Sequence, residues 1–417
     1  MTDIPRDKTF DCSLALLTNG YRFISERCER NGADLFLTRM MLRPAVCVRG
    51  EDAARMFYHP DRFSRKLAMP PQTLMSLQDI GSVQQLKGDA HRHRKQMFMS
   101  LMKPESIRRL GDLFEEKWRA RVKFWQASGT QVTLHHEVED LLCRAVCEWT
   151  GIRLSEAEAP RRAREFSAMI DGAGAIGPRN WMGLALRHRT ERWAQKLIND
   201  VRHSPLSRAE RSPLETIALY RDENGEALST ETAAVELVNI LRPTVAVGRF
   251  ITFAALALHT YPEYRDRLRE GGDEWREMFT QEVRRYYPFF PLVAGNAMED
   301  IEWQGHHIPR GTWVMLDMHG TNHDPRSWKD PHTFRPERFK NWKGNAFSLI
   351  PQGAGGFDDG HRCPGEWITI ELIKRALHML VSGMEYQVPP QDLTVRLSRL
   401  PAIPESRFII SQIREPH

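Results

Sequence analysis

A glycine-rich loop near the end of the chain leads to a cysteine at the expected start of a helix. The stretch PQGAGGFDDGHRCPGEWITIELIKRALHMLV, residues 351–381, places Cys363 at the N-cap, Pro364 at N1 and Glu366 at N3 of an amphipathic helix. The backbone N–H groups of Gly365 and Glu366 would then point at the sulfur and, with the helix dipole, favour a thiolate. This geometry suits a nucleophile or a thiolate ligand to a metal. The remaining alternative is a cysteine that merely begins a helix.

Two further motifs precede this loop in a fixed order. QEVRRYYP, residues 281–288, contains Glu282 and Arg285 on one helix face, a pair that alone usually forms a solvated salt bridge. TNHDPRSWKDPHTFRPERF, residues 321–339, follows, and the cysteine loop comes next. A cysteine hydrolase would need a basic histidine as partner, and His361 is close to the cysteine in sequence only. The ordered set of three motifs is more specific than any one of them.

An Arg-Pro pair interrupts what looks like the most buried helix. ELVNILRPTVAVGRFITFAALAL, residues 236–258, has Arg242 and Pro243 at its centre. Proline inside a helix costs about 3 kcal/mol, and a buried guanidinium without a partner is strongly unfavourable. The planar fork of arginine suits a carboxylate. That carboxylate belongs either to the protein or to a bound ligand.

The elements that must position these residues are mostly helices. Apolar residues recur every three or four positions in three long segments, residues 104–126, 135–152 and 190–203. Strand-like alternation is limited to residues 44–50 and to a hairpin around 304–311 within 300–318. The polar stretch 204–213 is predicted as a loop between helices. We therefore predict one domain over residues 1–417 that is mainly α with a small β-rich portion.

Composition excludes several classes of protein. The 417 residues are 41% hydrophobic and 27% charged, which argues against disorder, and a net charge of +5 is too weakly basic to indicate nucleic acid. The six cysteines show no paired spacing and are expected to be reduced thiols. The first residues resemble neither a signal peptide nor a membrane anchor. Residues 236–258 contain Glu236, Arg242 and Arg249 and are not predicted to span a membrane. We expect a soluble, cytoplasmic protein.

The three motifs together resemble those of the cytochrome P-450 superfamily of haem-thiolate proteins. Glu282 and Arg285 match its ExxR helix, PERF at 336–339 matches its next segment, and the cysteine loop matches at 360–365. The resemblance runs from YHPDRFSR, residues 58–65, to the last helix. It implies the cytochrome P-450 fold and haem b. It also implies that Cys363 is the axial ligand of the haem iron, and that Arg338 locks the ExxR pair.

Two departures from the usual superfamily pattern stand out. Gly356 and His361 replace the Phe and Arg that the usual cysteine loop carries, and Arg242 and Pro243 replace an acid-alcohol pair that relays protons to bound dioxygen. The second departure resembles the bacterial fatty acid peroxygenases, as do LRPTVAV, EVRRYYPF, GTNHDP and GHRCPGE. That branch implies long-chain fatty acid substrates, hydrogen peroxide as oxidant, and no NADPH or redox partner protein.

The peroxygenase resemblance assigns the Arg-Pro pair a role. Arg242 would hold the substrate carboxylate near the iron, where the acid serves as general acid-base in splitting the O–O bond of peroxide. Pro243 would free the Asn239 carbonyl and kink the helix. The anchored carboxylate would bring Cα and Cβ near the iron, so the expected product is a 2- or 3-hydroxy acid.

Further positions bear on the product and the substrate pocket. Members that decarboxylate fatty acids to terminal alkenes tend to carry histidine where hydroxylating members carry glutamine, and an ungapped alignment places Gln84 there. Phe289 and Phe290 resemble the bulkier α-selective members and favour the 2-hydroxy product, although packing differences of ~1–3 kcal/mol leave mixtures plausible. Ile170 matches a pocket-lining position, with an ordinary core residue as the alternative.

The basic run AHRHRK, residues 90–95, has several interpretations. It could be a nucleic-acid patch or a solvated helix face. In the resembled family this helix holds a haem propionate, which implies that His91 and Lys95, with Arg65, bind the propionates. A zinc site from His91 and His93 is disfavoured because residues two apart point apart on a helix.

Three rival functions remain from the sequence. A reductase-dependent monooxygenase is opposed by Arg242-Pro243, and a peroxide-dependent decarboxylase is opposed only by Gln84. A non-catalytic haem or fatty-acid sensor is the third, and no appended signalling domain supports it. Ligand binding without peroxide turnover would identify the sensor.

Overall fold

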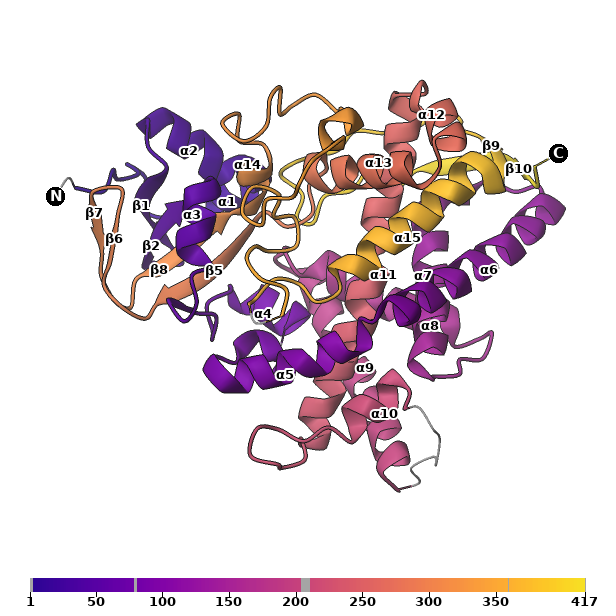
Figure 1. Ribbon diagram of the computed structural model, residues 1–417, viewed down its shortest axis with the longest axis horizontal. Coiled ribbons are helices and arrows are strands. Elements are labelled where there is room, and N and C mark those ends of the chain that lie inside the picture. The colour runs from indigo at the N-terminus through magenta and orange to yellow at the C-terminus, as the bar shows by residue number, and fades with distance from the viewer. Residues whose placement is uncertain (1–2, 79–80, 204–210, 359, 417) are drawn as a thin grey trace.

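The computed structural model describes residues 3–78, 81–203, 211–358 and 360–416. A small β-rich part near the N-terminus lies beside a larger helical part (Figure 1). The long helices of the larger part are α6 (Pro104–Ser128), α7 (Leu134–Thr150), α8 (Ala159–Gly172), α9 (Pro178–His203), α11 (Thr230–Thr260), α13 (Gly272–Tyr286) and α15 (Glu366–His378). This mainly helical architecture confirms the predicted fold class.

The remaining helices are short or connect the two parts. They are α1 (Ser13–Asn19), α2 (Phe23–Asn31), α3 (Glu51–Phe57), α4 (Pro71–Leu77), α5 (Gly88–Leu101), α10 (Pro213–Ala218), α12 (Tyr264–Glu270) and α14 (Met318–Asn322). Short helical turns lie at η1 (Gly20–Arg22), η2 (Val83–Gln85), η3 (Pro336–Phe339) and η4 (Met379–Gly383).

The largest sheet has the strand order β1-β2-β8-β5-β3. Its strands are β1 (Leu35–Met40), β2 (Arg43–Val48), β3 (Phe63–Ser64), β5 (Leu292–Ala297) and β8 (Trp313–Asp317). β2 and β8 are parallel, and the other neighbouring pairs are antiparallel. A hairpin joins β6 (Ile301–Trp303) to β7 (His306–Ile308). A smaller sheet contains β4 (Val132–Thr133), β10 (Ile409–Arg414) and β9 (Glu385–Gln387).

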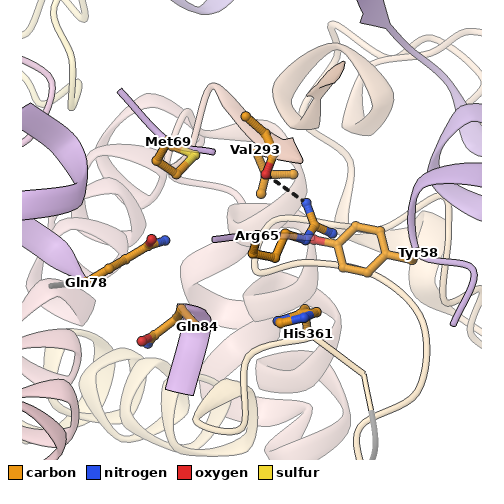
Figure 2. Close-up of a pocket in the computed structure, with 8 residues that line it drawn as sticks. Tyr58, Arg65, Met69, Gln78, Gln84, Val293 and His361 are labelled. Carbon is orange, nitrogen blue, oxygen red and sulfur yellow. Dashed lines mark hydrogen bonds between the residues drawn. The ribbon is translucent and has the colours of Figure 1, made fainter. Parts of the chain in front are cut away.

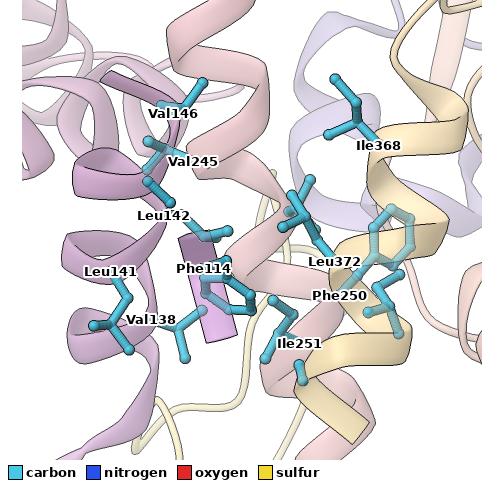
Figure 3. Packing of buried hydrophobic residues seen from close by; sticks show 14 of the residues in the cluster. Phe114, Val138, Leu141, Leu142, Val146, Val245, Phe250, Ile251, Ile368 and Leu372 are labelled. Atoms are coloured by element: carbon cyan, nitrogen blue, oxygen red, sulfur yellow. The ribbon is translucent and has the colours of Figure 1, made fainter. Parts of the chain in front are cut away.

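Helix α11 lies at the centre of the main hydrophobic core. Figure 3 shows it between α7 and α15, with Val245, Phe250 and Ile251 packed against side chains of its neighbours. It is apolar on all sides, as expected of a helix surrounded by protein. Of the described residues, only α11 is long and apolar enough to cross a membrane, but 94% of its most apolar window is buried inside the protein. A core helix of this kind positions the Arg-Pro pair in the interior.

The predicted helices are present, with different bounds. Residues 104–126 and 135–152 correspond to α6 and α7, whereas 190–203 is only the second half of α9. The first turns of α9 expose Trp181 and Met182, so the apolar pattern there did not indicate a buried face. Most of the predicted loop at 204–213 lies outside the described residues.

The strand predictions were incomplete. Residues 44–50 contain β2, and 300–318 contains β6, β7 and β8. Strand β1 was missed because LFLTRM is buried at most positions and does not alternate simply. Strand β5 was missed because a glycine and an asparagine, both poor strand formers, lie within it.

Candidate active site

Arg242 is a buried cation with no carboxylate within salt-bridge distance among the residues that the structure describes. It is 4% exposed, and its Nη2 donates a long hydrogen bond of 3.4 Å to Asn239 Oδ1. Its Nη1 is buried without a hydrogen-bond partner. Burial and the neighbouring Arg187 both lower the pKa of Arg242, and the Glu191 carboxylate opposes them. Because an uncompensated buried charge is costly, this position is suited to receive an anion.

Pro243 follows Arg242 inside α11 without ending the helix. The next residue, Thr244, donates its hydroxyl to the Ile240 carbonyl at 2.9 Å. The proline removes the backbone N–H that would otherwise bond the Asn239 carbonyl. The Arg-Pro pair therefore lies in continuous helix, and its environment is polar on the side of Asn239.

A cavity of about 70 Å³ lies between the β-rich part and the cysteine loop. Figure 2 shows Arg65, Tyr58 and His361 on one side of it and Gln78 and Gln84 on the other. Met69, Val293 and Ala294 complete the lining. Two of the residues predicted from the sequence, Arg65 and Gln84, thus share one cavity.

Arg65 is the buried cation of this cavity. Its Nη1 donates to the Ala294 carbonyl at 3.2 Å, and its guanidinium lies 3.9 Å above the Phe57 ring. Its Nε is buried without a hydrogen-bond partner. Burial lowers the pKa of Arg65 to about 10. An anionic group at this position would satisfy the unused donor and offset the cost of burying the charge.

Helix α5 brings His91 and Lys95 to the cysteine loop. Lys95 Nζ donates to the carbonyls of Gly360 at 2.6 Å and Arg362 at 2.5 Å. The His91 ring lies 4.0 Å from the His361 ring. The i, i+4 spacing therefore places both predicted residues on one face, directed at the loop that precedes Cys363.

Cys363 differs from the other five cysteines, and the structure describes all six. It alone is partly accessible, and the other five are buried. The Gly365 backbone N–H donates to its sulfur, and Gln352 Nε2 lies 3.9 Å away. Burial raises the pKa of the Cys363 thiol, while Gly365, Lys95 and Arg284 oppose that rise. The sulfur is therefore held in a fixed position and can act as a soft metal ligand. A bound metal cation would keep it deprotonated as a thiolate.

The predicted N-cap position of Cys363 was wrong. Helix α15 begins at Glu366 with Gly365 as its N-cap, because a turn at Pro364 and Gly365 precedes the helix. The Glu366 N–H points to the Cys363 carbonyl at 3.4 Å instead of the sulfur. Only one of the two expected backbone donors, Gly365, reaches the sulfur.

A buried ion network lies behind the cysteine loop. Glu282 accepts two hydrogen bonds from Arg285, at 2.8 and 2.9 Å, and a third from Arg338 Nε at 3.2 Å. Arg285 also donates to the carbonyls of Asn322 and Pro331. Glu282 and Arg285 are fully buried. The structure thus brings together the three residues that the sequence grouped.

Arg242 and the remaining predicted pocket residues are not among the residues that line the 70 Å³ cavity. Ile170 on α8 is 6% exposed and belongs to the main core. Phe289 stacks on Phe250 of α11 at 4.2 Å, and Phe290 is 38% exposed. Neither phenylalanine nor Ile170 lines that cavity.

Sequence reasoning missed several residues around this site. Tyr58, Met69 and Gln78 line the cavity, but nothing in their local pattern indicated it. Arg284 forms a buried ion pair with Glu366, which Arg362 also contacts at 2.7 Å. The only signal was that Arg284 adjoins Arg285 in a double-arginine motif.

The residues present fit a haem. Cys363 would supply one soft axial ligand, and a group with carboxylates would find Arg65 in the cavity lining. His91 lies against the cavity residue His361, and Lys95 donates to the carbonyls of the cysteine loop. The unused Arg65 Nε is the observation that most directly calls for an anion. Of the described residues, no group of three or more His, Cys, Asp or Glu side chains could hold a bare metal ion.

Comparisons with known proteins agree with this geometry. The family profile of cytochrome P450 matches residues 186–406. Cytochrome P450 71A8 of Mentha piperita is 25% identical over 244 residues, covering 52% of this chain and 48% of that protein. The chain therefore spans about half the length of this curated relative.

Solved structures match over nearly the whole chain. Cytochrome P450SP alpha (CYP152B1) in complex with (R)-ibuprophen is 45% identical, with 97% of this chain and 99% of that chain covered and a TM-score of 0.94. Cytochrome P450EX alpha (CYP152N1) with myristic acid is 37% identical over all of both chains, with a TM-score of 0.95. A cytochrome P450 OleT variant in complex with arachidonic acid is 33% identical, covering 100% of this chain and 99% of that chain, with a TM-score of 0.96.

Proposed function

Because this chain belongs to the cytochrome P450 family, in its CYP152 fatty acid peroxygenase branch, and is a haem-binding oxidoreductase, we propose that it hydroxylates long-chain fatty acids at the 2- or 3-carbon with hydrogen peroxide. The observation that carries the proposal is Arg242, a buried cation with an unused Nη1 and, among the described residues, no carboxylate within salt-bridge distance. Two solved relatives were captured with myristic and arachidonic acid.

Arg242 holds the carboxylate of the fatty acid in this mechanism. The carboxylate removes a proton from one oxygen of peroxide and returns it to the other as the O–O bond breaks and water leaves. Haem held by Cys363 supplies the oxidising chemistry at the C–H bond when it is bound. Arg242 also fixes the acid at one end, so that only its first carbons reach the iron. No NADPH and no redox partner protein are needed, since peroxide is already reduced by two electrons relative to dioxygen. One of its oxygen atoms goes to the product and the other leaves as water.

Gln84 supports hydroxylation over decarboxylation in this proposal. It lines the cavity, and its Oε1 accepts a long hydrogen bond of 3.5 Å from Asn239. A neutral amide at this position cannot act as a proton donor of histidine's strength. Loss of carbon dioxide to give a terminal alkene is the second candidate, and the relative OleT makes it worth measuring.

Product analysis tests the proposal. We expect haem-loaded protein, incubated with myristate and hydrogen peroxide alone, to give 2- or 3-hydroxymyristate by mass spectrometry. A matched incubation with NADPH, a reductase and no peroxide should give none. A terminal alkene as the main product would assign the chain to decarboxylation, and turnover only with NADPH would contradict the role of Arg242.

We propose that Arg65 helps to retain haem by binding a propionate. Arg65→Leu should speed haem transfer to an excess of apomyoglobin by about tenfold, since a hydrogen bond to a charged group contributes about 1.5 kcal/mol or more. The control is Arg62→Leu, because Arg62 pairs with Glu299 at the surface. Equal rates of haem transfer in the two variants would count against propionate binding by Arg65.

A further inference from the structure

Glu236 is a fully buried carboxylate at which three elements meet. It lies on α11, two turns before Arg242, and is 0% exposed. Its Oε1 accepts from Arg94 Nη1 on α5 at 2.9 Å and from the Val83 N–H of η2 at 2.8 Å. Its Oε2 accepts from Asn239 Nδ2 at 3.0 Å. Every contact made by this carboxylate is therefore with a donor.

This arrangement fixes the orientation of the Asn239 amide. A carboxylate only accepts hydrogen bonds, so Asn239 must present its NH₂ group to Glu236. Its carbonyl oxygen then faces the other way and accepts from Arg242 Nη2 at 3.4 Å. The same NH₂ group donates to Gln84 Oε1 at 3.5 Å. One amide thus connects the buried cation to the glutamine that lines the cavity.

The chain of contacts also joins the two ends of the site. Arg94 and Lys95 are consecutive on α5, yet Arg94 reaches Glu236 on α11 and Lys95 reaches the carbonyls beside Cys363. A shift of α5 would therefore move both the cysteine loop and the support of Arg242. Both oxygens of Glu236 accept hydrogen bonds, which suits this carboxylate to hold its neighbours in a fixed geometry. Arg94 Nε and Arg242 Nη1 are the buried donors of the network without a partner among the described residues.

We propose that Glu236 and Asn239 are positioning residues that set where the substrate carboxylate binds, and thereby which carbon is hydroxylated. Asn239 holds Nη2 of Arg242 against its own helix and leaves Nη1 for the carboxylate. Asn239 also hydrogen-bonds Gln84 and so fixes its side chain relative to Arg242. Neither Glu236 nor Asn239 is proposed to contact the fatty acid. The inference rests on the proposed function, since it requires an acid at Arg242.

Two substitutions break this series of hydrogen bonds in different ways. Asn239→Ala removes the link between Glu236 and Arg242, and alanine suits the helix. Glu236→Gln keeps the shape of the side chain but replaces one acceptor oxygen with an NH₂ donor. That NH₂ group must face either the NH₂ of Asn239 or the N–H donors of Arg94 and Val83. Should Glu236→Gln fail to fold, Asn239→Ala still decides the question.

The measurement is the affinity of each haem-loaded variant for myristate and for methyl myristate by calorimetry. The ester lacks the charge, so the ratio of the two dissociation constants reports the carboxylate contact alone. We expect each variant to weaken myristate binding about tenfold, or about 1.4 kcal/mol, and to leave ester binding unchanged, because only the acid depends on the position of Arg242. The double variant should bind myristate no more weakly than either single variant, because both residues act through the same series of hydrogen bonds. The ratio of 2- to 3-hydroxy product should also shift.

Two further variants separate the possible failures. Glu165→Gln is the matched control, since Glu165 is 2% exposed and pairs with Arg162 at 2.5 Å outside this network. It should keep the preference for the acid over the ester and the product ratio. An Arg242→Ala variant that keeps the preference for the acid would overturn the proposed function itself. Arg242→Ala could lose that preference while Asn239→Ala keeps both the preference and the product ratio. This result would overturn only the positioning role of Asn239.

Discussion

Replacing Arg242 with alanine lowers the rate of peroxide-driven myristate hydroxylation by about 10²- to 10⁴-fold, the range that a positioned acid-base group contributes. The physical reason is that the substrate carboxylate loses both its anchor and its position beside the iron. Initial rates at saturating peroxide, with haem content matched by absorbance, measure the loss. A variant that keeps more than a tenth of the wild-type rate would contradict the anchoring mechanism.

Arg249 provides the matched control on the same helix. It is also buried, but it pairs with Asp171 and donates to the Ala402 carbonyl at 3.3 Å. Arg249→Ala should therefore lower the free energy of unfolding, because it removes a partner of a buried carboxylate. It should leave the preference for myristate over its methyl ester unchanged. Arg242→Ala should show the opposite pattern, with lost preference and little loss of stability.

The contrast follows from what each guanidinium contacts. The structure pairs Arg249 directly with a carboxylate, whereas Arg242 donates to an amide oxygen and has Glu191 acting on it only from beyond salt-bridge distance. Removing an unpaired buried charge does not leave a second charge without a partner, so its net cost is small. Fatty acid should accordingly raise the melting temperature of the wild type and not that of Arg242→Ala.

A short carboxylate should partly replace the substrate acid. Adding acetate lets peroxide oxidise a small substrate without an acid group in the wild-type enzyme, because Arg242 can hold acetate at the same place. The rate should saturate with acetate concentration and vanish in Arg242→Ala. Rates independent of acetate would count against a carboxylate as acid-base.

The sequence predicted the chemistry of this site better than its local geometry. Arg242-Pro243 was conspicuous because a charge and a helix breaker occupy an otherwise apolar helix, and such conflicts are expected at functional sites. The role of Asn239 was hidden because an asparagine beside apolar residues has no distinctive pattern. Its partner Glu236 lies three residues earlier on the same helix, but Gln84 comes from η2, which only the fold brings beside α11.

The errors of the sequence analysis have physical causes. Cys363 was placed at the N-cap because Pro364 suits N1, but proline suits a turn equally well and the helix begins at Glu366. The strands of the largest sheet were undercounted because β1 is buried at most positions without simple alternation and β5 contains weak strand formers. Cavity residues such as Tyr58 and Gln78 depend on packing between distant segments, which no local pattern encodes.

Glu282→Gln should lower the free energy of unfolding by about 3–5 kcal/mol, the cost of breaking a buried ion pair. The amide keeps the shape of glutamate but leaves Arg285 and Arg338 without an anion in a buried environment. Glu282 also accepts the Arg335 N–H at 2.7 Å, so the segment that carries Arg338 should loosen as well. Urea unfolding followed by circular dichroism measures the effect.

Haem should leave this variant before the helices unfold. Arg285 donates to the Asn322 carbonyl, and Asn322 Oδ1 accepts from the Ile350 N–H at 2.8 Å, just before the cysteine loop. Absorbance of the bound haem should therefore be lost at lower urea than the helical signal. The control is Glu337→Gln, in the same segment, because Glu337 is more exposed and a surface ion pair contributes only about 0–1 kcal/mol. Equal urea midpoints for the two variants would mean that the buried Glu282 network does not support the haem loop, and that the support of Cys363 comes instead from Lys95 and the Arg284–Glu366 pair.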